Sequence, residues 1–209
     1  IRRCGTSLTA SQLEQLLKSS EGWFAAVYLN LCSFSKSGEL PGKTSDIYQM
    51  FSASMLNPLP EDRKEFLSAM GLADEFTEEM AEFITKREDV HQILKMLTRQ
   101  NAFVTCLNDG QTYRFHHMMK ECAFRAFRTL DNSRQAFYYE RYGAWYEKHG
   151  AYIHALSAYW RNQNFAAILR VVQKDAGILL ASLKPEEVLE VLNRCPVSVL
   201  KEYPLAILV

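Results

Sequence analysis

The stretch between residues 103 and 116 departs from an otherwise helical sequence and restricts the fold more than any other feature. Phe103–Leu107 and Thr112–His116 are rich in aromatic and β-branched residues, which favour strands. Asn108-Asp109-Gly110-Gln111 stands between them and is typical of a tight turn, because Asn, Asp and Gly tolerate the backbone angles of hairpin turns. We therefore predict one β-hairpin within a mainly α fold.

Segments with helical periodicity lie on both sides of this hairpin, and His117–Leu130 follows it directly. The predicted helices before it are Asp46–Asn57, Glu61–Met70, a short helix capped by Thr77 that ends near Thr85, and Glu88–Gln100. Short helices, a longer helix, a hairpin and a further helix form the order of a winged-helix module. The sequence therefore predicts a winged-helix domain over residues 46–131.

The flanking regions are also predicted to be helical. Before residue 46 we expect a helix over Ala10–Ser19 capped by Thr9 with Leu13, Leu16 and Leu17 on one face, a buried helix over Gly22–Lys36, and a linker at Ser37–Lys43. After residue 131 we expect helices over Ser133–Lys148, Tyr152–Arg161, Phe165–Leu180 and Pro185–Asn193. These form αα-hairpins, and residues 144–156 resemble the tetratricopeptide pattern.

The charges balance, since the chain has 24 Lys and Arg residues and 24 Asp and Glu residues. This balance argues against a dedicated nucleic-acid binder, although a local basic face is compatible with it. The five cysteines are scattered without a CxxC pair, so we expect small buried residues in a reducing compartment and no metal site or disulfide. No apolar run is long enough for a membrane span, and the start lacks a signal-peptide core. We expect a cytoplasmic location and no membrane partner.

The two ends of the sequence favour a piece of a longer protein. The chain opens at Ile1 without an initiator Met and closes on the apolar run Leu205–Val209. An apolar end of this kind is expected to be buried by further helices, as in a stack of helical repeats.

Three segments together resemble the large LuxR-type, MalT-like (maltose-regulator-like) ATP-dependent transcriptional regulators. They are residues 20–29 (SEGWFAAVYL), residues 113–121 (YRFHHMMKE) and residues 194–206 (RCPVSVLKEYPLA). Their order and spacing cover nearly the whole chain. The departures are small: Phe24 replaces a Pro or small residue, and Met118-Met119 replaces Leu-Phe.

The resemblance implies a signal-transduction (STAND-type) ATPase with a nucleotide-binding module, a helical lid, a winged helix, an arm, a repeat sensor and a DNA-binding helix-turn-helix. This chain would hold the end of the lid (1–45), the winged helix (46–131), and the arm with the start of a TPR-like repeat superhelix (132–209). Its implied function is regulatory coupling, which relays nucleotide and inducer state between the ATPase and the sensor. The partners would be those two domains of the same protein, which would self-associate when activated through ATP and inducer. DNA would bind only through a domain absent here.

No catalytic or metal residues are assigned. The sequence has no GxxxxGK[ST] motif and no HExxH or GxSxG motif, so we expect no enzyme activity and no cofactor in this piece, while ATP or ADP is expected for the full-length protein.

His116 is the one candidate site residue. In the resembling family the matching histidine faces the phosphates of bound ADP and holds the resting state, a role that an imidazole can fill chemically. The alternative is a histidine that packs in the wing and makes one hydrogen bond. His117 is expected only to begin the following helix.

Other residues have competing interpretations. Trp23 and an aromatic group in the last third of the chain are expected to be core rather than ligand-stacking residues; this group comprises Phe137, Tyr138, Tyr139, Tyr142, Trp145, Tyr146, Tyr152, Tyr159 and Trp160. Lys120, Arg125 and Arg128 put positive charge on one helix, which allows a second hypothesis, a winged-helix DNA-binding regulator with a helical ligand- or protein-binding domain. Glu88 and Asp89 at the start of the expected recognition helix argue against that hypothesis, because they would face phosphate. A helical protein-interaction scaffold is the third hypothesis.

Overall fold

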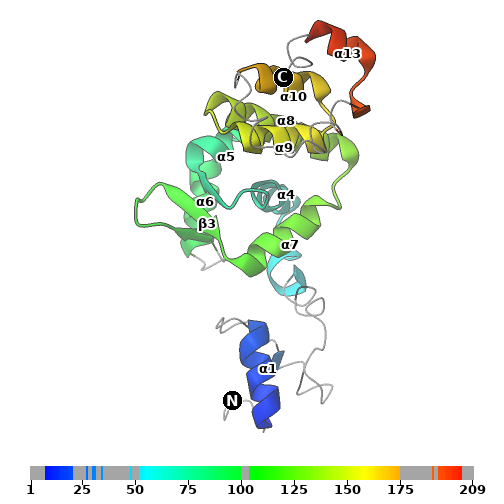
Figure 1. Cartoon of the computed structure of the whole chain (residues 1–209). Coiled ribbons are helices and arrows are strands. Elements are labelled where there is room, and N and C mark those ends of the chain that lie inside the picture. Colours follow the sequence, from blue (N-terminus) through cyan, green and yellow to red (C-terminus); the bar gives the residue numbers. More distant parts are fainter. Residues whose placement is uncertain are drawn as a thin grey trace. The chain divides into compact units, whose positions relative to one another are not determined.

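The computed structural model describes residues 8–20, 27, 30–31, 34, 48, 52–99, 104–174, 190 and 193–203 (Figure 1). The chain divides into two compact units, and neither is continuous in sequence. The first unit takes residues 1–75, 93–108 and 113–126, and the second takes residues 76–92, 109–112 and 127–209. The predicted domain borders at residues 45/46 and 131/132 stay a prediction.

Helix α1 (Ala10–Ser20) begins at a reciprocal cap. The backbone N–H of Gln12 donates to the Thr9 hydroxyl at 3.3 Å, and the Thr9 N–H donates to the Gln12 side-chain oxygen at 2.9 Å. The predicted cap is therefore confirmed. Leu13, Leu16 and Leu17 share one face of this helix, as predicted; Leu16 is buried, while Leu13 and Leu17 are 37% and 56% exposed.

Four residues of the predicted Gly22–Lys36 helix are described, namely Val27, Asn30, Leu31 and Phe34, and all four are helical. The predicted linker at residues 37–43 and Trp23 lie outside the described residues. Of the predicted Asp46–Asn57 helix, residue 48 is helical and Ser52–Leu56 forms the π-helix η2 before Pro58 stops it.

The next three helices agree closely with prediction. Helix α4 spans Glu61–Met70, α5 spans Glu78–Thr85 and α6 spans Val90–Arg99. The Thr77 hydroxyl accepts the Met80 N–H at 3.2 Å and caps α5. The four apolar residues of α6, which recur at helical spacing, are at most 1% exposed; they are Val90, Ile93, Leu94 and Leu97.

The predicted hairpin is confirmed as β2 (Val104–Cys106) and β3 (Thr112–Phe115), which pair antiparallel with Val104 opposite Phe115. In its turn the Asp109 carboxylate accepts the Thr112 N–H at 2.9 Å, and Gly110 takes a φ of +70°. The prediction of a single hairpin missed a third strand, β1 (Glu75–Thr77), which gives the sheet order β1-β3-β2. Three residues are too few to show an alternating pattern, so only pairing with β3 reveals β1.

Helix α7 (His117–Phe127) ends three residues before the predicted Leu130. The reason is the start of α8 (Asn132–Lys148), where the Asp131 carboxylate accepts the Arg134 N–H at 2.9 Å. A capping residue takes an extended backbone, so the helix cannot run up to Asp131, and residues 128–130 form the turn between α7 and α8. The mainly α class with a winged-helix hairpin is confirmed.

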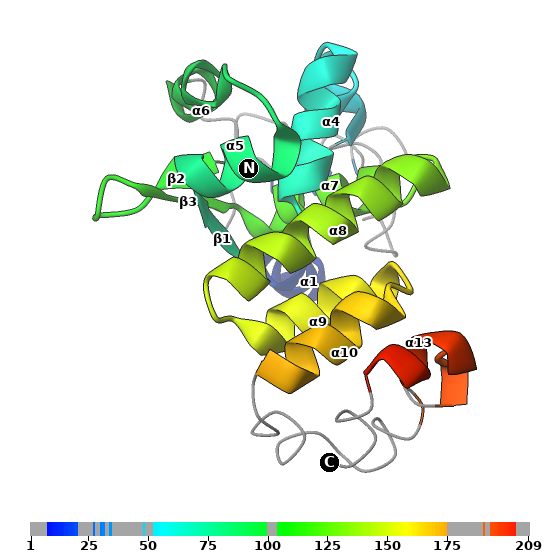
Figure 2. The ribbon, with the colours of Figure 1, turned by 90° about the horizontal axis from the view of Figure 1, so that it is seen from above.

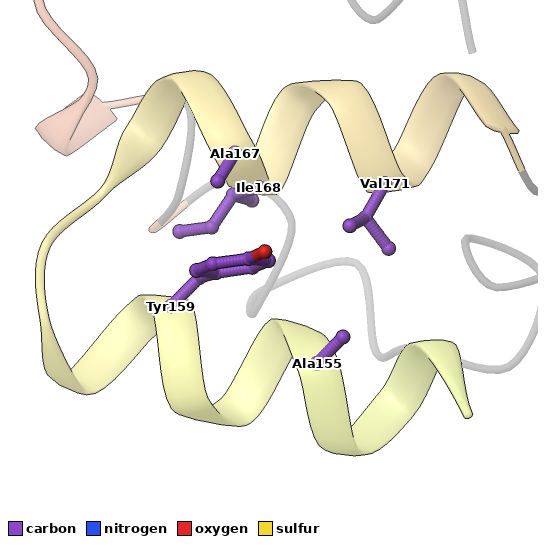
Figure 3. Close-up of a cluster of buried hydrophobic side chains, with 5 residues drawn as sticks. All are labelled: Ala155, Tyr159, Ala167, Ile168 and Val171. Atoms are coloured by element: carbon purple, nitrogen blue, oxygen red, sulfur yellow. The ribbon is translucent and has the colours of Figure 1, made fainter. Parts of the chain in front are cut away.

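Helices α8, α9 (Tyr152–Arg161) and α10 (Phe165–Lys174) lie side by side in the second unit (Figures 1 and 2). A short helix α13 (Val197–Glu202) follows. Between α9 and α10, Tyr159 and Ile168 form a buried cluster with Ala155, Ala167 and Val171 (Figure 3). The predicted continuation of α10 to Leu180 and most of the predicted Pro185–Asn193 helix lie outside the described residues. The tetratricopeptide resemblance stays a prediction.

Gly143 sets the distance between α8 and α9. A Cβ at this position would lie 2.4–2.7 Å from ring atoms of Tyr159, so only glycine allows the Tyr159 ring to pack against the α8 backbone. Tyr159 is 1% exposed and is the largest fully buried side chain of this unit.

We therefore expect Gly143→Ala to destabilise the second unit, although alanine usually stabilises a helix interior relative to glycine. The expected loss of unfolding free energy is about 1–3 kcal/mol, the usual cost of overpacking a core. Urea unfolding followed by circular dichroism measures it. Ser157→Ala on the exposed side of α9 is the control and should change stability little; a Gly143→Ala protein as stable as this control would contradict the packing argument.

Candidate functional site

His116 lies between β3 and α7, and its backbone and ring both serve the start of that helix. Its carbonyl accepts the Lys120 N–H at 2.9 Å, and its Nδ1 accepts the Met118 N–H at 3.4 Å. The ring is half-buried and stands 4.3 Å, between centroids, from the exposed ring of His117, the first residue of α7. Because Nδ1 accepts, the neutral imidazole carries its proton on Nε2. His116 is thus a helix-capping residue, and its role toward phosphate stays a prediction.

The positive charge predicted along α7 is largely neutralised by neighbouring acids. Lys120 forms an ion pair with Asp74, and Arg125 pairs with Glu121 at 2.8 Å. The Arg125 guanidinium also stands 4.4 Å above the ring of Tyr48. A helix face built of such pairs presents little net charge to a phosphate backbone.

Acidic residues also flank the start of α6, the expected recognition helix. Asp89 binds the Arg87 guanidinium through two bonds, of 2.7 and 2.8 Å, and Glu78 contacts His91 at 3.0 Å. Carboxylates at this end of the helix are unfavourable for contact with DNA, as the sequence indicated.

The cysteines were expected to be buried, and this is wrong for one of them. Cys122 and Cys195 are buried, whereas Cys106 is exposed on β2. Burial raises the pKa of the Cys122 thiol above its ordinary value. Strand alternation places Cys106 on the same face of β2 as the buried Val104, but Cys106 is the last residue of the strand, next to the turn, and is exposed there. Cys4 and Cys32 lie outside the described residues.

Arg141 of α8 holds the C-terminal end of α5. Its Nε donates to the carbonyl of Phe83 at 2.5 Å and to that of Ile84 at 3.1 Å, and its Nη2 also donates to the Phe83 carbonyl. Helix ends leave their last carbonyls without partners inside the helix, and a cation there also interacts favourably with the helix dipole. Here α5 ends at Lys86, whose left-handed φ of 55° stops the helix.

Aromatic packing completes this junction between α5 and α8. The Arg141 guanidinium stands 4.5 Å from the ring centroid of Phe83, and Phe83 in turn packs on Trp145 with centroids 5.4 Å apart. Burial lowers the pKa of Arg141 from its ordinary value, but guanidinium groups stay protonated in proteins. The junction therefore combines a fixed cation, two helix-end carbonyls and stacked rings.

A buried carboxylate on the same helix ties α8 to α9 and α10. Glu147 has a side chain only 8% exposed, and it accepts hydrogen bonds from Tyr159 at 2.9 Å, Arg170 at 2.8 and 3.1 Å, and Lys174 at 2.6 Å. The bond from Arg170 is the main reason why the pKa of Glu147 falls to about 2 from its ordinary value of 4.5. Desolvation and the contact with Glu147 raise the pKa of Tyr159.

The aromatic residues of the arm are mostly core, as expected. Tyr138, Tyr142, Trp145 and Tyr159 are buried, and most of the others are half-buried. Phe137 is the exception, with 38% of its surface exposed, because it lies outside the contacts between the helices. The cations of Lys86 and Arg141 stand over its ring. In the part of the chain that the structure describes, no group of His, Cys, Asp and Glu side chains could hold a metal ion, and no helix is long and apolar enough to cross a membrane.

Comparison with known proteins finds a domain family that matches part of this chain. Residues 52–136 match the model of the MalT winged helix domain. The match starts at η2, contains the whole α4–α7 region with its hairpin, and ends in the first turns of α8. The chain carries a MalT-type winged helix domain.

Two kinds of curated relative match nearly the whole chain. The HTH-type transcriptional regulator AlkS of Alcanivorax borkumensis is 23% identical over 199 residues, which cover 92% of this chain and 22% of AlkS. The serine/threonine-protein kinase PknK of Mycobacterium tuberculosis is 23% identical over 202 residues, which cover 93% of this chain and 18% of PknK. The chain therefore spans about a fifth of the length of these relatives. The resemblance to MalT-like regulators is confirmed.

The MalT-type winged helix domain contains some of the site residues and leaves others outside. His116 and the whole of α5 lie within the matched residues, whereas Arg141 and Glu147 lie beyond residue 136. Sequence reasoning assigned no role to Arg141 or to Glu147. A single Arg and a single Glu in a polar helix do not reveal their partners in the sequence. Arg141 contacts a helix end and Glu147 contacts a tyrosine, and both partners are distant in the chain.

We expect Arg141→Met to loosen the α5–α8 junction, because two helix-end carbonyls lose their charged donor. The expected cost is about 1–3 kcal/mol of unfolding free energy. Urea unfolding followed by tryptophan fluorescence suits the measurement, since Trp145 lies in the junction. Arg161→Met, at an exposed arginine of α9, is the matched control; an equal loss in both variants would count against a special role of Arg141.

The ionisation of Glu147 makes the free energy of unfolding depend on pH between about 2 and 4.5. A carboxyl whose pKa falls on folding stabilises the native state above its ordinary pKa of 4.5, and this contribution disappears as the pH falls through about 2. We expect Glu147→Gln to cost roughly 2–3 kcal/mol at pH 7, because Arg170 and Lys174 lose their partner, and to cost progressively less below pH 4.5.

Denaturant unfolding from pH 7 to pH 2.5 tests this difference. Glu121→Gln removes a carboxylate from an exposed pair in α7 and is the control, with an expected change below about 0.5 kcal/mol. A difference between wild type and Glu147→Gln that stays constant with pH would show that the charge of Glu147 does not stabilise the fold.

Proposed function

We propose that this chain is the regulatory coupling region of a LuxR/MalT-like transcriptional regulator. In this role it relays the nucleotide state of an ATPase module to a sensor, and the inducer state of the sensor to the ATPase module. The observation that carries the proposal is the junction at Arg141. Helix α5 belongs to the winged helix domain, yet its end is held by Arg141 of α8, which lies beyond the last matched residue, 136.

Such a junction is suited to mechanical transmission. A rigid-body movement of α5 moves the carbonyls of Phe83 and Ile84, and the charged hydrogen bonds carry the movement to α8. From α8, the contacts of Gly143 and Glu147 continue into α9 and α10. Interfaces of this kind shift as units, because packed elements slide or rotate rather than deform.

The two kinds of relative support a coupling role rather than an output role. One is named as a transcriptional regulator and the other as a protein kinase, and both share nearly the whole of this chain. A region common to proteins with different outputs is expected to serve a step that the outputs share. The ion pairs of Arg87, Lys120 and Arg125 with neighbouring acids agree with this view, because they reduce the positive charge around α6 and α7.

The remaining parts of the proposal concern the full-length protein. The chain has no phosphate-binding loop of its own, so ATP or ADP would bind to a module outside it, and the chain itself is not an enzyme. DNA would be bound by a separate helix-turn-helix domain. The ADP-bound resting state would be held in part by His116, and self-association would follow its release.

A mobility-shift assay separates coupling from direct DNA binding. The 209-residue chain should not shift a DNA duplex at low ionic strength, because its charges are balanced and locally paired. Salt-dependent binding by this chain would instead favour the winged-helix DNA-binding regulator and would overturn the coupling role.

The role of His116 is tested in the full-length protein by two substitutions. His116→Ala removes both the helix cap and the imidazole, whereas His116→Asn keeps a good capping residue and removes only the reach of Nε2. We expect both to weaken ADP binding by about tenfold, as the loss of one charge-assisted hydrogen bond does, and His117→Ala to leave it unchanged. If the His116→Asn protein binds ADP with normal affinity, His116 serves only as a helix cap and does not contact the nucleotide.

A further inference from the structure

A cavity in the second unit is lined by both aromatic and polar side chains, and the proposed coupling role does not involve it. Its volume is about 290 Å³, and the described residues that line it are Trp160, Gln163, Phe165 and Arg194. The rings of Trp160 and Phe165 meet at 89° with centroids 6.1 Å apart. Two aromatic walls, one amide and one cation thus face the same small space.

The loop between α9 and α10, which presents Gln163, is fixed from the side of α8. The Glu140 carboxylate accepts the side-chain amides of Asn162 at 3.0 Å and Asn164 at 2.9 Å, so the residues on both sides of Gln163 are held. Gln163 itself adopts a left-handed φ of 54°. Glutamine rarely takes this conformation, because its Cβ crowds the backbone, and glycine or asparagine would fit it better. Here it ends α9, because the Gln163 N–H donates to the Trp160 carbonyl at 3.0 Å and the Asn164 N–H donates to the Tyr159 carbonyl at 3.0 Å, which fixes the backbone that carries the Gln163 side chain.

Arg194 is positioned by the residue that follows it. Cys195 is buried against Leu169 of α10, in a cluster to which Phe165 also belongs. This anchor places the Arg194 guanidinium 5.4 Å from the ring centroid of Trp160, where it also pairs with the exposed Glu190 at 2.9 Å. The side chain is 61% exposed, so it can exchange Glu190 for another carboxylate without leaving the Trp160 ring.

We propose that this cavity binds a small aromatic carboxylate. The ring of the ligand would pack in the corner formed by the perpendicular rings of Trp160 and Phe165. Its carboxylate would replace Glu190 on Arg194, and the Gln163 amide would donate a hydrogen bond to the ligand. Arginine suits a carboxylate because its planar donors bind both oxygens at once. The cavity volume is near the lower end of the range for ligand sites, which favours a single ring.

The site is independent of the coupling role, and its test needs only the 209-residue chain. Benzoate is the probe, and benzamide, which has the same shape without the charge, is its control. Saturation-transfer NMR of the ligand signals measures both. We expect benzoate to bind with a dissociation constant in the millimolar range and benzamide to bind at least about tenfold more weakly, since the charged hydrogen bonds to Arg194 are lost. Equal binding of the two probes, or no binding of benzoate, would overturn the proposal.

Substitutions assign the binding to this cavity. Arg194→Gln should weaken benzoate binding at least about fivefold while leaving benzamide binding unchanged. Glu190→Gln should strengthen benzoate binding, because it removes the competing carboxylate from Arg194. Benzoate affinity that is unchanged in both variants would show that the ligand binds elsewhere.

Gln163→Gly separates a binding role from a structural one. Glycine relieves the left-handed backbone, so the thermal midpoint of the protein should stay the same or rise, while benzoate affinity should fall about threefold with the loss of the amide hydrogen bond. A purely structural glutamine would change stability and leave affinity unaltered, which would contradict the proposed contact.

Discussion

The hydrogen bonds from Arg141 to the end of α5 are the interaction on which the arrangement of the second unit depends. They join a helix of the MalT-type winged helix domain to the part of α8 that extends beyond the matched residues. The bonds satisfy a local need, since the last carbonyls of α5 have no partners within their own helix. A single side chain therefore completes the end of one helix and fixes the position of another.

Helix α8 can serve both its neighbours because of its geometry. Successive residues of an α-helix are about 100° apart, so residue 143 lies about 200° around the axis from residue 141, and residue 147 lies about 240° from it. Arg141 thus contacts α5 from one side, while Gly143 and Glu147 contact α9 and α10 from the opposite side. Helix α8 therefore packs against α5 on one side and against α9 and α10 on the other.

The sequence predicts those features that rest on local signals. Caps at Thr9 and Thr77, the turn at Asn108–Gln111 and the apolar spacing of α6 gave the elements and their order correctly, because each depends on a few neighbouring residues. The misses all need contacts distant in sequence. Strand β1 exists through pairing with β3, and Glu147 gains its environment from α9 and α10. His116 was found through a resemblance, and its capping bond could not be predicted from spacing alone.

The two sides of α8 differ in strength, and this difference determines where movement can occur. Glu147 is buried, carries a full charge and accepts bonds from three side chains on two helices, so separating α8 from α9 and α10 would leave a buried carboxylate without partners. The donors of Arg141 meet neutral carbonyls at a helix end, and a half-buried guanidinium can recover water when it leaves them. Sliding at the α5 junction therefore costs less than separation on the other side. Helices α8, α9 and α10 should therefore move as one body when a movement of α5 acts on Arg141.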